Sequence, residues 1–195
     1  QLQHPNIIPI HEFGELPDGR LYFTMTQIKG KEFTDFIRGV HKASDYESWN
    51  ASQNGTTFRQ LIQIFHKICE TMAYAHSVGV IHRDLKPENV MIGGFGEVLV
   101  VDWGIAKVFG SEEMIEMDED DILHTGRSEQ NHMATRMGII AGTPSYMSPE
   151  QAEGRIDLLG PQSDIYTLGA ILYQILSGRP PYNGSSALEI VEKVK

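Results

Sequence analysis

The spacing of apolar residues along the chain predicts two long helices. Between residues 58 and 77 they recur at intervals of three and four, and Gly79 follows as a stop signal. The apolar positions of this helix are Leu61, Ile62, Phe65, Ile68, Cys69, Met72 and Ala75. A second helix is predicted over 164–177, where a glycine and two prolines end the pattern. Shorter helices are predicted over 32–39 and 187–195.

The remaining apolar segments are short and predict strands. Two of them, 7–13 and 20–28, flank a turn with the sequence Leu-Pro-Asp-Gly. Three more are predicted further along, at 80–81, 90–92 and 98–101. Residues 41–57 and 108–139 are polar and predict loops, the second of which carries an acidic block. Two strands followed mainly by helices favour an α+β fold over an alternating βαβ fold.

Charge and cysteine content narrow the possible partners and location. The formal net charge of −10 argues against nucleic acid or an anionic membrane as the main partner. One cysteine, Cys69, excludes an intrachain disulfide and fits a reducing compartment. No apolar run approaches the roughly 20 residues of a membrane helix, and the first residues resemble no signal peptide. We therefore expect a cytoplasmic domain without a membrane segment of its own, with an anchor outside these residues left open.

The strongest chemical signal is the stretch His82-Arg83-Asp84-Leu85-Lys86-Pro87-Glu88-Asn89. Phosphoryl transfer requires a carboxylate to orient the accepting hydroxyl, a cation near the moving phosphoryl group and oxygen ligands for Mg²⁺. Asp84, Lys86 and Asn89 supply these three groups within six positions.

Two further motifs follow in the same chain. Asp102-Trp103-Gly104 comes directly after an apolar strand, which places a carboxylate where it can chelate Mg²⁺ across phosphates. The segment Gly142-Thr143-Pro144-Ser145-Tyr146-Met147-Ser148-Pro149-Glu150 then closes a long polar region.

In this order and spacing the three motifs resemble eukaryotic-like serine/threonine protein kinases, over essentially the whole chain. The phrases at 101–104 and 159–164 resemble kinases of planctomycetes and related bacteria. The resemblance implies a protein kinase-like fold that uses ATP and Mg²⁺ to phosphorylate serine or threonine on proteins. It implies one role for each matching residue: Asp84 as catalytic base, Lys86 as γ-phosphate contact, Asn89 and Asp102 as metal ligands, and Thr143 as a bridge between Asp84 and Lys86.

The resemblance also implies an adenine site and a regulatory arginine. Met25 falls at the gatekeeper position, so that the hinge follows it; the implied nucleotide contacts are the backbone of Thr26 and Ile28, Met91 beneath the adenine, and Glu32 near the ribose. Arg83, directly before the catalytic aspartate, suggests control by phosphorylation of the activation segment, with Thr135 favoured over Thr125.

The family pattern also assigns structural roles and domain limits. Asp164 is expected to bind the backbone of the catalytic loop, and His82 to pack in the core near Ile10 and Trp103. Residues 1–28 would be the end of the amino-terminal lobe with the hinge, and 29–195 the carboxyl-terminal lobe with an activation segment at 102–150. The glycine-rich loop and the strand lysine of the family would precede Gln1, so a domain truncated at both ends is expected.

Three alternatives to an active protein kinase stay open at this point. A kinase fold can serve as a pseudokinase or scaffold, or act on a small molecule, although the Gly142–Glu150 segment is typical of peptide-binding kinases. The residues 1–195 alone are expected to have little or no activity, because the missing elements would cover ATP. The acidic block is interpreted as a solvated loop, and the alternative interpretation is a pseudo-substrate or a docking surface for basic partners.

Overall fold

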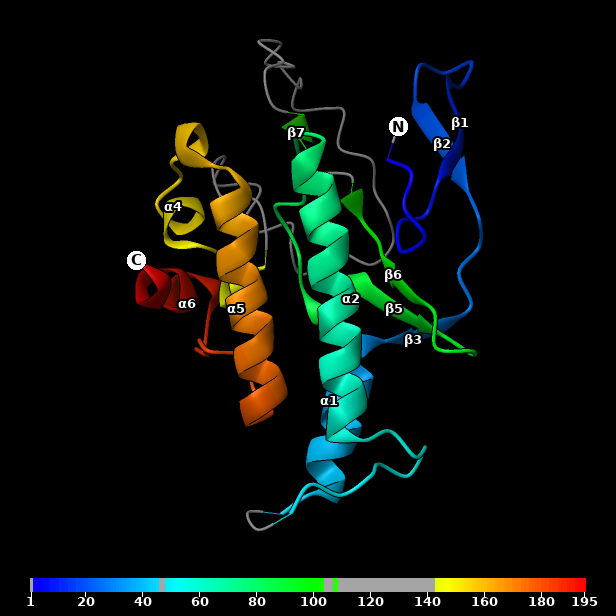
Figure 1. The fold of residues 1–195 in the computed structure, drawn as a ribbon. Coiled ribbons are helices and arrows are strands. Elements are labelled where there is room, and N and C mark those ends of the chain that lie inside the picture. Colours follow the sequence, from blue (N-terminus) through cyan, green and yellow to red (C-terminus); the bar gives the residue numbers. More distant parts are fainter. Residues whose placement is uncertain (1, 46–47, 104–106, 109–142) are drawn as a thin grey trace.

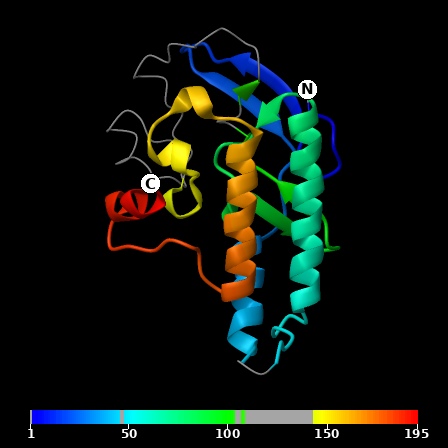
Figure 2. The same ribbon diagram turned by 60° about the vertical axis from the view of Figure 1, so that its left-hand side comes forward.

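The fold is built around two long helices that run side by side in opposite directions (Figures 1 and 2). These are α2 (Phe58–Ser77) and α5 (Pro161–Ser177). The computed structural model describes residues 2–45, 48–103, 107–108 and 143–195.

The local sequence explains where α2 begins and ends. Thr57 and Gln60 form a capping box: the Thr57 hydroxyl accepts from the Gln60 backbone N–H, and Gln60 Oε1 accepts from the Thr57 backbone N–H at 2.7 Å. After the helix, Gly79 adopts a φ of 77°, which side chains disfavour. The structure confirms the predicted bounds of this helix.

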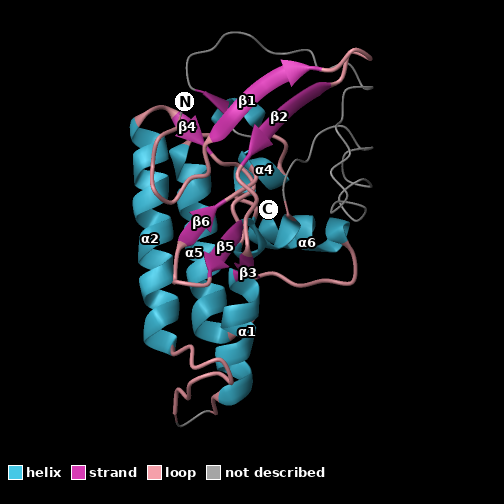
Figure 3. Cartoon of the chain, turned by 90° about the vertical axis from the view of Figure 1, so that its right-hand side faces the viewer, coloured by secondary structure: helices cyan, strands magenta, loops and turns pink. Residues whose placement is uncertain are grey.

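In the described part of the chain, the strands form three small antiparallel sheets (Figure 3). The first is the hairpin of β1 (Ile10–Glu15) and β2 (Leu21–Met25), which pairs Glu15 with Leu21 across the predicted turn. The other two are the sheet β3-β5-β6, made of β3 (Gly30–Glu32), β5 (Val90–Gly93) and β6 (Val98–Val100), and the pair of β4 (Val80–Ile81) with β7 (Lys107–Val108).

The other helices are shorter and lie around this pair and the sheet β3-β5-β6 (Figures 1 and 3). The α-helices are α1 (Phe33–Ala43), α4 (Pro149–Ala152) and α6 (Ala187–Val194), and the 3₁₀ turns are η1 (Pro87–Asn89), η3 (Pro144–Tyr146) and η4 (Ile156–Leu158).

The main hydrophobic core joins α1, α2, α5 and the sheet β3-β5-β6. Its fully buried members include Phe33, Leu61, Met72, Val100 and Ile171. A second cluster holds α6 against the segment that follows η3, through Met147, Ala152, Val191 and Val194. Each buried aliphatic or aromatic side chain stabilises the fold by about 1.5–3 kcal/mol, so these contacts fix the framework that carries the polar loops.

Several element boundaries differ from the sequence prediction. The first strand begins at Ile10 rather than residue 7, and Ile7 instead forms a buried parallel bridge to Val100. Helix α1 continues to Ala43, beyond the predicted end at residue 39. Helix α5 begins at Pro161, three residues early, because proline is well tolerated in a first helical turn. Among the described residues, no helix is long and apolar enough to cross a membrane.

Candidate active site

The Asp84 carboxylate is held by Lys86 and Thr143. Lys86 Nζ donates to Asp84 Oδ2 at 2.9 Å and to Thr143 Oγ1 at 2.6 Å. Asp84 Oδ1 accepts from the Thr143 backbone N–H at 2.8 Å and from the Thr143 hydroxyl at 3.2 Å. The Asp84 and Lys86 side chains are only 11% and 14% exposed, so the pair is weakly screened by solvent. The result is an ordered carboxylate with a cation beside it.

Asn89 and Asp102 lie on neighbouring backbone segments, and Asn89 contacts Asp84. Asn89 Nδ2 donates to the Asp84 backbone carbonyl at 2.8 Å, and the Val101 N–H donates to the Asn89 carbonyl at 2.9 Å. Asp102 follows Val101 directly and adopts a left-handed φ of 61°. Within the described part of the chain, neither Asn89 Oδ1 nor the Asp102 carboxylate accepts a hydrogen bond from protein.

These two side chains fit a Mg²⁺ site that a phosphate group completes. Mg²⁺ prefers oxygen ligands and is commonly bound through one or two carboxylates together with phosphates and water. No group of three or more histidine, cysteine, aspartate or glutamate side chains suited to a metal occurs among the residues described. Asn89 and Asp102 offer fewer oxygen ligands than Mg²⁺ takes, so an ion bound by them would also need ligands such as phosphate oxygens and water.

The backbone before Asp84 is strained and is held by Asp164. Arg83 adopts a φ of 71°, which is unusual for a residue with a side chain. Asp164, from the first turn of α5, accepts from the His82 N–H at 2.8 Å and from the Arg83 N–H at 3.0 Å. Asp164 Oδ2 also lies 2.8 Å from His76 Nε2, near the end of α2. The expected contact between Asp164 and this loop is confirmed.

His82 is completely buried behind the loop. Its Nε2 lies 3.0 Å from the Val101 carbonyl oxygen, and its ring packs against Trp103 with centroids 4.7 Å apart. Burial lowers the pKa of the imidazole, although the Asp164 carboxylate opposes this. The predicted contact of His82 with Trp103 is confirmed. Ile10, which was also expected near His82 in the core, is 46% exposed on β1.

The predicted nucleotide contacts lie on β3, on β5 and in the connection between β2 and β3. Met91 is buried in β5, and its Cα partner across the sheet is Glu32 of β3. Thr26 and Ile28 lie in the connection between β2 and β3, and the Thr26 hydroxyl lies 2.9 Å from His11 Nε2. Met25, the expected gatekeeper, is 47% exposed at the end of β2. Strand pairing thus brings Glu32 and Met91 together.

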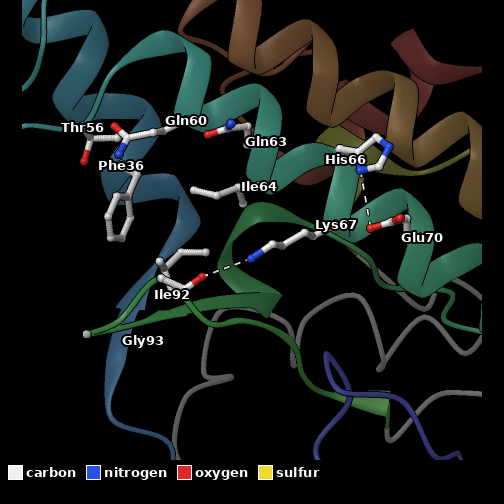
Figure 4. A pocket seen from close by; sticks show the side chains of 12 residues that line it. Phe36, Thr56, Gln60, Gln63, Ile64, His66, Lys67, Glu70, Ile92 and Gly93 are labelled. Carbon is white, nitrogen blue, oxygen red and sulfur yellow. Dashed lines mark hydrogen bonds and ion pairs between the residues drawn. The ribbon is translucent and has the colours of Figure 1, made fainter.

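Two cavities lie among the described residues, and neither is lined by Asp84. The larger, of about 640 Å³, lies between α1, α2 and the β5–β6 turn, where Phe36, Ile64 and Lys67 face it (Figure 4). No predicted site residue lines it. The smaller, of about 70 Å³, lies between Arg83, α4 and the segment that follows α4.

The sequence comparison decides the family. The profile of the protein kinase domain matches residues 1–195. The chain belongs to the protein kinase family. The predicted family and its α+β fold are thereby confirmed.

Several curated relatives of this kinase domain are bacterial proteins. It is 39% identical over 185 residues to the serine/threonine-protein kinase PknD of Protochlamydia amoebophila, covering 93% of the chain and 18% of the relative. It is 36% identical over 193 residues to the PknD of Chlamydia pneumoniae, covering 97% of the chain and 19% of the relative. It is 38% identical over 189 residues to the PknD of Chlamydia trachomatis, covering 93% of the chain and 19% of the relative. The chain spans less than a fifth of the length of these relatives.

Two residues that contact the catalytic-loop region of the kinase domain were missed from sequence. Gln151 of α4 donates from Nε2 to the Arg83 carbonyl oxygen at 2.6 Å, and His76 contacts Asp164. Neither belongs to the motifs used above. The only sequence signal for Gln151 is its position directly after Pro149-Glu150.

The expected partner of Arg83 cannot be placed. Thr125, Thr135 and the acidic block lie outside the described residues. Arg83 Nε is buried without a hydrogen-bond partner among the residues described, and burial lowers the pKa of the guanidinium.

Proposed function

We propose that this chain carries the catalytic carboxylate and metal ligands of an ATP- and Mg²⁺-dependent kinase that phosphorylates serine or threonine on proteins. The observation that supports it best is the ordered Asp84–Lys86–Thr143 cluster. The names of the bacterial relatives support the serine/threonine class.

Each side chain of the cluster has one task in this proposal. The oxygen of the substrate hydroxyl bonds to the γ-phosphorus, and the bond between the γ-phosphorus and the ADP oxygen breaks. Asp84 accepts the proton that the substrate hydroxyl loses. Lys86, fixed by Asp84 and Thr143, neutralises charge on the transferred group. Asn89 and Asp102 would hold Mg²⁺, which when bound neutralises the β- and γ-phosphates.

The nucleotide side of the proposal is supported by strand pairing. Met91 lies opposite Glu32 across β3 and β5, so the proposed adenine floor and ribose contact adjoin. Thr26 and Ile28 would supply backbone contacts to the adenine edge.

We also propose that residues 1–28 belong to the smaller lobe and 29–195 to the larger, in a cytoplasmic domain. The hairpin β1–β2 is a separate sheet, which supports the division, although Asn6 and Ile7 pair with β6. A single cysteine and the use of ATP support the location.

The test is phosphate transfer by the full-length protein. We expect purified protein with Mg²⁺ and ATP labelled at the γ-phosphate to yield phosphoserine or phosphothreonine on an acceptor protein. Asp84→Asn is expected to lower kcat by at least about 10²-fold, since general base catalysis typically contributes that much. Asp157→Asn, an exposed aspartate on η4, serves as the matched control and should leave kcat unchanged.

A wild-type protein that transfers no phosphate under these conditions would contradict the proposal, as would an Asp84→Asn variant with normal kcat. Phosphate found on a small molecule but never on protein would instead support a small-molecule kinase.

A further inference from the structure

The peptide units that lead to Asp84 are fixed one by one. The N–H of His82 and the N–H of Arg83 both donate to the Asp164 carboxylate, which orients two consecutive peptide planes. The left-handed φ of Arg83 makes this control necessary, because strained backbone persists only where its surroundings hold it.

The third peptide plane, between Arg83 and Asp84, is held by Gln151. Its carbonyl oxygen, on Arg83, accepts from Gln151 Nε2 at 2.6 Å. Gln151 is 7% exposed, so this hydrogen bond has little competition from water. Since the same plane carries the N–H of Asp84, its orientation determines where the Asp84 side chain begins.

The other end of the Gln151 carboxamide is also used. Oε1 accepts from the Ser148 N–H at 3.1 Å and from the Ser148 hydroxyl at 3.2 Å, as part of the capping box of α4. A backbone N–H can only donate and the Arg83 carbonyl can only accept, so the network allows one orientation of the amide. Gln151 therefore joins the start of α4 to the catalytic loop.

The same segment also holds the Asp84 side chain. Thr143, eight positions before Gln151, donates to Asp84 Oδ1 through both its N–H and its hydroxyl. The segment 143–152 thus contacts the carboxylate at one end and its backbone at the other.

We propose that Gln151 is a positioning residue for Asp84, which couples the placement of α4 to the placement of the catalytic carboxylate. This inference rests on the proposed function. Gln151 touches neither substrate nor nucleotide; it acts through the Arg83–Asp84 peptide.

Gln151→Glu tests the donor separately from the helix cap. Glutamate retains an acceptor for Ser148 and is common at this capping-box position. As a carboxylate, however, it turns an oxygen instead of an N–H toward the Arg83 carbonyl. When protonated, it regains one O–H donor. The control is Glu153→Gln, the reverse exchange at an exposed position just after α4.

The assay measures kcat and the KM for ATP of the full-length kinase between pH 6 and pH 8. For Gln151→Glu at pH 8 we expect kcat to fall by about tenfold to a hundredfold, as for other small misplacements of reacting groups, with KM nearly unchanged. Burial raises the pKa of a carboxyl group, so the ratio of variant to wild-type kcat should rise as the pH falls. A role in stability alone gives no such recovery.

Three results would overturn the inference: a folded Gln151→Glu variant with wild-type kcat at pH 8, a kcat ratio that does not change with pH, or an equal loss in Glu153→Gln. If the wild-type protein transfers no phosphate, the proposed function fails instead. Amide hydrogen exchange at His82, Arg83 and Asp84 then still tests the contact. It should be faster in Gln151→Glu than in Glu153→Gln, and equal rates would refute the positioning role.

Discussion

Replacing Asp164 by asparagine should destabilise the fold, because a buried carboxylate supports a strained loop. The Asp164 side chain is 2% exposed and accepts the N–H groups of His82 and Arg83 at 2.8 and 3.0 Å. Asparagine has the same size but only one oxygen, so one of the two N–H groups would face an NH₂ group. The difference in stability between this variant and the wild type therefore measures the contribution of the second acceptor oxygen and of the negative charge.

The magnitude follows from the two effects. Losing a hydrogen bond to a charged group costs about 1.5–3 kcal/mol, and a buried N–H left without an acceptor costs about 1–3 kcal/mol. We therefore expect a loss of about 3–5 kcal/mol. For a domain of this size each kcal/mol lowers Tm by about 2–4 °C, so Tm should fall by roughly 10 °C.

Thermal unfolding followed by circular dichroism measures this directly. Asp157→Asn makes the same chemical change at an exposed site and should leave Tm within about 2 °C, as surface substitutions usually do. A Tm for Asp164→Asn as high as that of this control would refute the reasoning, because the two N–H bonds would then contribute nothing to stability. Compared with Asp164→Asn, the variant Asp84→Asn is expected to show a large loss of activity and a smaller change in Tm.

Three further predictions concern single side chains. Thr143→Val removes the hydroxyl between Lys86 and Asp84 and should lower kcat about tenfold or more, whereas Thr143→Ser should retain most activity in the same transfer assay. Burial lowers the pKa of His82, so below about pH 6.5 the unfolded state binds more protons than the folded state. The free energy of unfolding should therefore decrease as the pH falls through this range. Urea titrations should show a weaker pH dependence of this free energy in His82→Phe than in the wild type. Burial raises the pKa of the Cys69 thiol, so mass spectrometry should find it alkylated by iodoacetamide much more slowly in folded than in unfolded protein.

Some of the architecture was predictable because its signals are local. The helix over 58–77 combines a regular apolar stripe with a capping residue and a terminal glycine, and all three act within one element. The strands β4 and β5 were located to within a residue. Strand β3 was missed, because its three residues carry no alternating pattern and pair only through contact with β5.

The proposed catalytic residues could be named from sequence for a similar reason. Asp84, Lys86 and Asn89 lie in one short stretch, so their chemistry can be read without knowing the fold. That Asp84 and Thr143 share hydrogen bonds across 59 positions was implied only by family resemblance. Gln151 lies outside the three sequence motifs, and a single glutamine gives no periodic signal that could have marked it.

The sequence by itself therefore determined the helical framework and the family, and it named the proposed reactive groups, because all of these depend on neighbouring residues. Family resemblance implied that Thr143 and Asp164 hold the loop of Asp84, but only the tertiary structure gave the geometry of these contacts and the part played by Gln151. Asp164 reaches the loop from α5 and Gln151 reaches it from α4, 81 and 68 positions away from Arg83. Such hydrogen bonds depend on how helices pack, since the hydrophobic core fixes their distance and direction to the loop.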